Sequence, residues 1–378
     1  MELAGIAPTP FAGMVLADLG AEVLRIDRPG DRGLLDLMGD ARHDLLGRGK
    51  RSVLVDLKRP DGAGVVLRLA ASADALIEGY RPGVAERLGI GPAECHAVNP
   101  RLVYGRLTGW GQDGPLAGTA GHDVGYLALS GVLHTIGTAE APVIPPNVLG
   151  DCGGGGMLLA VGVLAALLQA KRSGLGQVVD ASIVEGVALL ATQVYGLLHA
   201  GLWRDARAAN LFDGAAPHYG VYRTADDRHL AVAPLEPKFW SEFAALLGGG
   251  MEALNPYEPE NWPALRARIA ERIASRTRAE WLAVFDGTDA CVSPVLSLTE
   301  AAGGAHPQLA ARETFVAPGG VPQPAPAPRF SVTPAVLSTL PPYPGEHTRQ
   351  ALLDWGVSDV EALLAAGVVS LGESAGTG

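Results

Sequence analysis

The stretch "ELAGIAPTPFAGMVLADLGAEVLRID", residues 2–27, decides the fold class. "ELAGI" has the apolar character of a strand, "PFAGMVLADLG" predicts a helix that Pro10 begins and Gly20 closes, and "EVLRID" predicts a second strand. The same alternation returns in "SVLVDL", "GAGVVLRLAASA", "ALIEGY", "RLVYGRLTG" and "QVVDAS". Strand, helix and strand in repetition predict an α/β domain with a Rossmann-like parallel sheet.

The α/β domain is expected to end in a long helix, and three further segments follow it. A long apolar helix is expected from about Ile183 to Leu202, and "YGVYRTADDRHLAVAP" predicts two strands around a polar turn, followed by amphipathic helices. Nine prolines between positions 317 and 345 indicate a stiff, extended connector. "EHTRQALLDWG" then predicts a helix with Thr348 at its N-cap. The predicted organisation is a large domain over 1–205, a small α+β domain over 206–316, a connector over 317–345 and a C-terminal helical segment over 346–378 that returns to the large domain.

Composition restricts the class of protein. The net charge of −11 and the pI near 5.3 argue against nucleic acid or an anionic membrane surface as a partner. Three separated cysteines show no metal-binding spacing, which suits a reducing cytoplasm, and no signal peptide is visible. The apolar run after the four glycines at 153–156 predicts a helix from about Met157 to Ala170. At 1.5 Å per residue it would be roughly 21 Å long, too short to span a membrane, so a buried core helix is expected.

The basic residues of the large domain indicate the ligand class. No G-x-G-x-x-G follows the first strand, so a dinucleotide fingerprint is missing. Lys and Arg nevertheless outnumber Asp between Arg25 and Arg59, and "RIDRPG" and "GYRPG" place arginines directly after strands. Ligands of parallel α/β sheets bind at this edge, and the guanidinium fork matches phosphate oxygens. A phosphate-bearing small molecule is the expected ligand.

"AGHDVGYLALSG", residues 120–131, sets His122 beside Asp123. By itself this pair is ambiguous, because lone histidines are more often structural than catalytic. Ordered stretches along nearly the whole chain, however, resemble the class III CoA-transferase family, which includes α-methylacyl-CoA racemases. They are the opening stretch, "RGKRSVLVDLK", "LIEGYRPGVAERLGIGP", "NPRLVYGRLTGWGQDGP", "AGHDVGYLALSG", "PPNVLGDCGGGG", "GQVVDASIVEG", "LEPKFW", "DGTDACVSPVL" and "GEHT".

The resemblance implies two reactions that share an aspartate, here Asp151 in "LGDCGGGG". In transferases this aspartate is the nucleophile that forms an acyl anhydride, whereas racemases add a histidine about thirty residues earlier, where this chain has His122. Transferases also tend to carry a glycine-rich loop in the small domain, where this chain reads "LFDGAAPHYG"; the run ending at Gly250 is better interpreted as a helix C-cap. Racemase is the preferred hypothesis, with a CoA-transferase and a catalytically silent acyl-CoA-binding protein as alternatives.

The chemistry of racemisation explains these residue types. Inverting the carbon beside a thioester carbonyl needs one acid/base group on each face, and His122 and Asp151 would supply them. An α-proton of pKa roughly 20 against a histidine near 6.5 leaves a gap on the order of 18 kcal/mol, so the enolate oxygen must be stabilised. "GDCGGGG" running into a helix at Met157 is expected to offer free N–H groups for that oxygen.

The resemblance further implies the remaining site residues and the assembly. Glu236 in "LEPKFW" is expected to hydrogen-bond His122 and fix its tautomer. Arg28, Lys58 and Arg87 are expected to hold the phosphates and adenine end of CoA, which is part of the substrate; no separate cofactor and no metal are expected. An interlocked homodimer with the active site between subunits is also implied. The other expected substrate-binding residues are Val55, Asp56, Leu57, Arg81, Gly121, Asp123, Tyr126, Cys152 and Gly153.

Overall fold

The computed structural model describes residues 1–30 and 35–372 of the 378-residue chain. The chain forms two compact units. The first unit comprises residues 1–130, 145–190 and 307–378, so it collects both ends of the chain. The second comprises residues 131–144 and 191–306.

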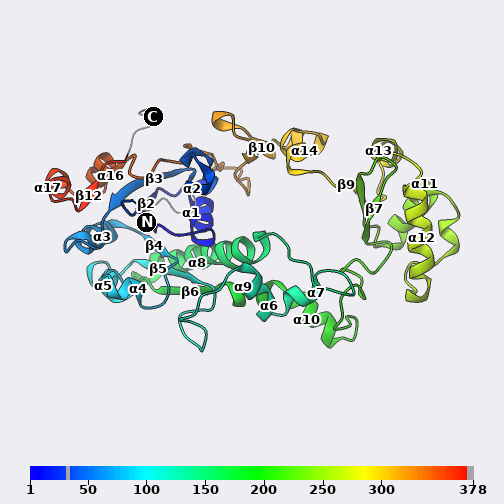
Figure 1. Ribbon diagram of the computed structural model, residues 1–378, viewed down its shortest axis with the longest axis horizontal. Coiled ribbons are helices and arrows are strands. Elements are labelled where there is room, and N and C mark those ends of the chain that lie inside the picture. Colours follow the sequence, from blue (N-terminus) through cyan, green and yellow to red (C-terminus); the bar gives the residue numbers. More distant parts are fainter. Residues whose placement is uncertain (31–34, 373–378) are drawn as a thin grey trace. The chain divides into compact units, whose positions relative to one another are not determined.

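A seven-stranded sheet forms the centre of the first unit (Figure 1). Its order is β12-β3-β2-β1-β4-β5-β6, and every pair is parallel except β12 with β3. The predicted parallel sheet is therefore confirmed, with one antiparallel edge strand that the sequence did not indicate. The strands are β1 (Glu2–Leu3), β2 (Val23–Asp27), β3 (Lys50–Val55), β4 (Ala75–Glu78), β5 (Val103–Thr108), β6 (Val178–Ser182) and β12 (Val369–Ser370).

One face of this sheet is apolar. Leu3, Leu24 and Val53 alternate with polar neighbours along β1, β2 and β3, and they form one cluster with residues of the helices α3, α5, α16 and α17. The helices of the first unit are α1 (Pro8–Asp18), α2 (Leu35–Met38), α3 (Gly62–Ser72), α4 (Val84–Arg87), α5 (Pro92–Val98), α6 (Asp123–Leu129), α8 (Leu158–Ser173), α9 (Ile183–Leu190), α15 (Pro307–Ala311), α16 (Thr348–Asp354) and α17 (Val360–Ala365), with 3-10 turns η1 (Ala41–His43), η2 (Leu45–Gly47) and η6 (Pro318–Gly320), and a short hairpin of β10 (Phe315–Val316) and β11 (Gln323–Pro324).

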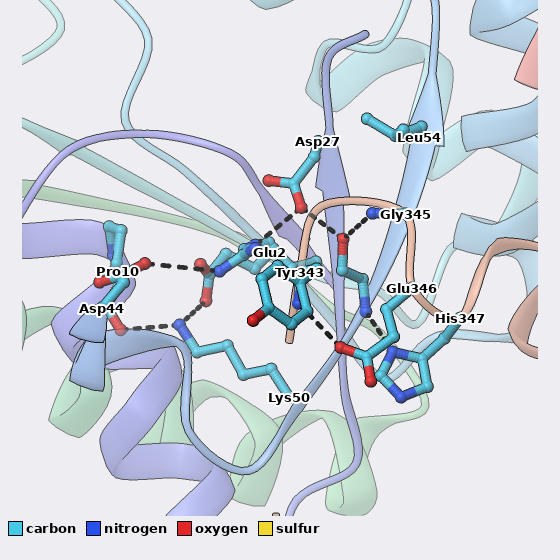
Figure 2. Close-up of polar contacts among 12 residues, drawn as sticks. Glu2, Pro10, Asp27, Asp44, Lys50, Leu54, Tyr343, Gly345, Glu346 and His347 are labelled. Atoms are coloured by element: carbon cyan, nitrogen blue, oxygen red, sulfur yellow. Dashed lines mark hydrogen bonds and ion pairs between the residues drawn. The ribbon is translucent and has the colours of Figure 1, made fainter. Parts of the chain in front are cut away.

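The opposite face carries a cluster of buried charges between the sheet and α1 (Figure 2). The Lys50 ammonium donates to the Glu2 carboxylate at 2.6 Å and to the carbonyl of Pro10 at 2.9 Å, and both ionic side chains are fully buried. Arg25 donates to Asp27 at 2.9 Å. Several basic residues of the predicted phosphate-binding cluster, Arg25 and Lys50 among them, are thus structural ion-pair partners.

The glycine-rich segment is helical, contrary to the prediction. A π-helix, η3 (Val148–Met157), runs without a break into α8, so the helix begins nine residues before the predicted Met157. The combined segment has 26 residues, and its most apolar 18-residue stretch has a mean hydropathy of 1.8, so by length and composition it could cross a membrane. The length argument against a span was therefore wrong. One side of α8 packs on the sheet: a Cβ at Gly105 of β5 would lie 2.9 Å from Leu159 and 3.1 Å from Val163.

The C-terminal segment pairs with β3 through β12 (Figure 1). Thr348 is not the N-cap of α16, because it is the first helical residue and His347 occupies the cap. The Thr348 hydroxyl instead accepts a hydrogen bond from Leu54 N at 3.1 Å and donates to Gly345 O at 3.0 Å. It therefore attaches the end of the chain to the sheet.

The second unit contains the predicted strand pair. β7 (Gly220–Arg223) and β8 (His229–Val232) are antiparallel, and β9 (Val292–Pro294) joins β8. The expected long helix over 183–202 is two helices, because the chain leaves helical geometry at Ala191, where the units divide. A core around Phe243 and Trp281 packs the sheet on its helices. The helical elements are α7 (Val132–Thr135), α10 (Thr192–His199), α11 (Pro237–Leu247, with Gly248 as its C-cap), η4 (Met251–Ala253), η5 (Pro259–Asn261), α12 (Trp262–Ile273), α13 (Arg278–Phe285) and α14 (Leu298–Ala302).

Candidate active site

A cavity of about 490 Å³ lies at the carboxyl ends of β1 and β4 in the first unit. These strands are neighbours in the sheet, but the chain order reverses between them, and such a switch point is where open α/β sheets bind ligands. The cavity is lined by Ile6, Ala7, Pro8, Thr9, Gly79, Tyr80, Arg81, Pro82, Leu107, Thr108, Gly109, Trp110, Ala117, Thr119, Ala120, Gly121, His122, Asp123, Tyr126, Asp151 and Ile183. The predicted acid/base pair and four of the predicted substrate contacts therefore share one cavity.

His122 stands at the N-terminal end of α6 on a wall built from aromatic rings. The rings of Trp110 and Tyr126 meet edge to face at a centroid distance of 4.7 Å. A Cβ at Gly121 would lie 2.7 Å from the Tyr126 ring and 2.8 Å from the Trp110 ring. Only glycine fits there, so the rings fix the backbone that presents the exposed His122 side chain.

Asp151 occupies the first turn of η3 and is half-buried. Its backbone N–H donates to the Asp123 carboxylate at 2.7 Å, and Asn147 donates to its side chain at 3.2 Å. A Cβ at Gly150 would lie 2.2 Å from the same Asp123 oxygen, so the glycine before Asp151 makes room for that bond. Asp123 therefore links the helix that carries His122 to the helix that carries Asp151.

The pKa of the Asp151 carboxyl is raised, chiefly because burial disfavours its charged form. The hydrogen bond from Asn147 and the nearby His122 ring oppose the rise, and the Asp123 charge adds to it. A carboxyl group whose pKa is shifted toward neutrality is suited to exchange protons with a carbon acid.

The expected oxyanion site is not where the glycine run predicted it. Gly153–Gly156 lie inside η3 rather than before a helix, and the N–H of Asp151 is already bonded to Asp123. Cys152 N donates to Asn147 O at 3.3 Å. These N–H groups are therefore engaged within the helix or with Asp123.

A second cavity, of about 590 Å³, adjoins the first through Tyr80, which lines both. Arg28 and Lys58 line it, and the Arg28 guanidinium lies over the Tyr80 ring at 5.8 Å. Asp56 accepts a hydrogen bond from the Lys58 N–H at 3.0 Å and so shapes the loop after β3. Its lining residues are Arg28, Pro29, Gly30, Asp56, Leu57, Lys58, Tyr80, Val84 and Leu88.

The remaining predicted contacts do not line the second cavity. The Val55 side chain is fully buried in the core on β3. Arg87 is exposed on α4, between Val84 and Leu88. Arg81 lines the first cavity and not the second, which we call the cationic cavity because Arg28 and Lys58 line it. Cys152 and Gly153 are half-buried in η3, where burial raises the pKa of the Cys152 thiol.

Glu236 belongs to the second unit, where it is the N-cap of α11 and its carboxylate is exposed. Its role toward His122 therefore stays a prediction. Within the described residues, no group of three His, Cys, Asp or Glu side chains is arranged to hold a metal ion.

Two cavity residues were missed by sequence reasoning. Thr9 Oγ1 and Trp110 Nε1 are buried atoms without a hydrogen-bond partner in the part of the chain that the structure describes. Thr9 is the second residue of α1, the helix that follows the first strand, and the switch-point rule flags this region. Nothing in the sequence indicates that its hydroxyl is buried and unpartnered.

Comparisons with known proteins identify the family of this chain. The family model described as CoA-transferase family III matches residues 1–348. The α-methylacyl-CoA racemase of Mus musculus is 45% identical over 96% of this chain and 93% of its own length, and that of Homo sapiens is 44% identical over the same shares. A crystal structure of a CaiB/BaiF family protein from Brucella suis superposes with a TM-score of 0.81 at 26% identity, covering 94% of this chain and 97% of that one. The chain belongs to the CoA-transferase family III.

Proposed function

We propose that this protein is an isomerase that interconverts the R and S epimers of 2-methylacyl-CoA thioesters. One observation carries the proposal: His122 and Asp151 line a single cavity that adjoins, through Tyr80, a second cavity lined by Arg28 and Lys58. The two racemases of mouse and human, with 44–45% identity over nearly the whole chain, support the same reaction.

The proposed mechanism is a two-base proton transfer. One of the pair, His122 or Asp151, removes the α-proton as a base, and the electron pair moves into the thioester carbonyl to give an enolate. The protonated partner then returns a proton to the opposite face of the same carbon. The raised pKa of Asp151 supports this role, because its carboxyl is more readily protonated near neutral pH than an exposed aspartate.

The cationic cavity is proposed to hold the carrier half of the substrate. CoA brings phosphates on an adenine nucleotide, and Arg28 and Lys58 provide charges in an otherwise acidic protein. Arg87 is proposed to reach the same phosphates from the surface of α4.

Assembly and compartment belong to the same proposal. We expect a homodimer in which Glu236 of one subunit hydrogen-bonds His122 of the other, a cytoplasmic location, and no cofactor beyond the CoA of the substrate. Analytical ultracentrifugation tests the dimer: a monomer at assay concentration would remove the cross-subunit role of Glu236.

One experiment tests the reaction. A single epimer of a 2-methylacyl-CoA is incubated with the protein in deuterium oxide, and inversion and deuterium uptake are followed together. Both are expected. Absence of exchange would remove the racemase proposal.

The family also contains CoA-transferases, and Asp151 could act there as an acyl-anhydride nucleophile. A covalent mass increase on Asp151 with acyl-CoA, together with full CoA-transfer activity in His122→Ala, would favour the transferase.

A further inference from the structure

The start of α1 places an unused hydrogen-bond donor on the wall of the candidate active site. Thr9 is the second residue of this 11-residue helix, lines the cavity, and is 1% exposed. Its hydroxyl has no hydrogen-bond partner among the residues that the structure describes. An unmade hydrogen bond at a buried group is unfavourable, so a bound ligand that accepts from Thr9 would recover this cost.

The backbone around Thr9 favours a ligand oxygen that carries negative charge. No side chain caps α1, and its residues Pro8 and Pro10 carry no N–H, so Thr9 supplies the only amide among the first three helical positions. The helix dipole places partial positive charge at this end. Ala7, which caps the helix, has a φ of 27°, a strained backbone for a residue with a side chain.

Thr9 lines the same cavity as the acid/base pair His122 and Asp151. A Cβ at Gly156 would lie 2.6 Å from Pro8 O, so the start of α1 abuts the helix that carries Asp151. On its other side, Thr9 Oγ1 would lie 2.6 Å from a Cβ at Gly79, another wall residue. The start of α1 therefore contacts both η3 and the segment that follows β4.

We propose that the Thr9 hydroxyl donates a hydrogen bond to the thioester oxygen of the acyl-CoA and stabilises the enolate that forms when the α-proton leaves. This role rests on the proposed racemase function. It replaces the predicted oxyanion site, because Gly153–Gly156 lie inside η3 and Asp123 already accepts from the N–H of Asp151. Thr9 would then be a catalytic residue that acts on the reacting oxygen, while His122 and Asp151 move the proton.

Three variants test the role of Thr9. Thr9→Val keeps the shape and removes the hydroxyl, Thr9→Ser keeps the hydroxyl, and Thr135→Val is a matched control whose hydroxyl donates to Val132 O at 2.8 Å outside the cavity. The readouts are deuterium exchange of a 2-methylacyl-CoA at saturation, its KM, and thermal unfolding. Thr9→Val is expected to lose about 10²-fold in exchange rate at saturation, the effect of removing one oxyanion donor, with KM changed little. Thr9→Ser should recover most of the rate.

Stability separates this role from simple packing. Because the Thr9 hydroxyl has no partner in the free protein, Thr9→Val should unfold at the wild-type temperature or above it. A wild-type exchange rate in Thr9→Val would overturn the inference, as would a loss of rate that comes with a lower unfolding temperature and is not restored in Thr9→Ser. Trp110→Phe removes the other unpartnered donor; if it alone abolishes exchange while Thr9→Val does not, the oxygen is bound by Trp110. A wild-type protein without exchange would remove the racemase function itself, and this role with it.

Discussion

The first unit contains two groups of charged side chains with different surroundings: the buried cluster between the sheet and α1, and the charges that line the candidate active-site cavity. The Lys50 ammonium has a carboxylate at 2.6 Å and a carbonyl at 2.9 Å, in a place that water does not reach. The Asp151 carboxylate has a single neutral donor at 3.2 Å, and a second carboxylate, Asp123, lies beside it. The buried charge of Lys50 is paired with an opposite charge, whereas the Asp151 carboxylate has a neutral donor and a neighbouring carboxylate, and its pKa is raised.

The largest expected effect lies on the active-site side of this comparison. His122→Ala should abolish net epimerisation and stop exchange of the proton on its own face, while exchange on the other face continues; Asp151→Ala should do the reverse. General acid–base groups contribute about 10²–10⁴-fold, so losses of this size are expected. By analogy with the family, His122 is expected to serve the S epimer and Asp151 the R epimer. Proton NMR of each epimer in deuterium oxide measures this, and symmetric loss of exchange in both variants would argue against one base on each face.

The second prediction breaks the paired cluster. Lys50→Met leaves the Glu2 carboxylate buried without its cation, which is expected to cost about 3–5 kcal/mol of unfolding free energy. Denaturant unfolding followed by circular dichroism measures the loss. The double variant Glu2→Gln with Lys50→Met removes both charges and should be markedly more stable than Lys50→Met alone. Equal stabilities would mean that the two charges are not coupled.

The third prediction concerns the cationic cavity. Arg28→Ala and Lys58→Ala should each raise the KM for acyl-CoA by roughly 10-fold or more, because a charge-assisted hydrogen bond to phosphate contributes about 1.5–3 kcal/mol. Exchange at saturation should change little. Arg68→Ala is the control, since Arg68 pairs with Asp359 at 2.6 Å on the surface. If both cavity variants behave like the control, the phosphates bind elsewhere.

The smallest expected effect concerns the stability cost of the Asp151 charge. Because folding raises the pKa of Asp151, the folded protein binds this proton more readily than the unfolded chain, so the native state is favoured at low pH and that contribution is lost as pH rises through the folded pKa. Asp151→Asn should therefore unfold at a slightly higher temperature than wild type at pH 7. The advantage should shrink as the pH falls toward the ordinary aspartate range. A constant difference across this range would show that the charge is not its cause.

The sequence predicted what repeats along the chain and missed what depends on contact between distant segments. The parallel strands were readable because apolar runs alternate with turn residues, as in "SVLVDL" and "ALIEGY". The helical state of Gly153–Gly156 was not, because glycine has low helix propensity. Packing overrides that propensity here: a Cβ at Gly154 would lie 2.7 Å from Val187, and one at Gly186 only 1.8 Å from Gly154 O.

The same difference between sequence patterns and long-range contacts applies to the candidate active site. His122 and Asp151 were identified from motifs, and the structure brings them into one cavity. Arg28 lines the second cavity, whereas Lys50 is buried against the Glu2 carboxylate. The sequence did not separate these two environments, because they depend on contacts between distant segments. Thr9 was not identified because burial without a partner has no sequence pattern.

The return of the C-terminal segment to β3 has a consequence for synthesis on the ribosome. The first unit begins with residue 1 but is completed by Leu352, Val360 and Val369, which belong to its apolar core. At 5–20 residues per second, roughly 10–40 s pass between translation of β6, the last parallel strand, and translation of these residues. During that interval the nascent chain exposes the free edge of β3 and an uncovered apolar face, both of which favour aggregation. A message truncated before the codon for Thr348 would therefore yield a misfolded chain, not a shortened enzyme.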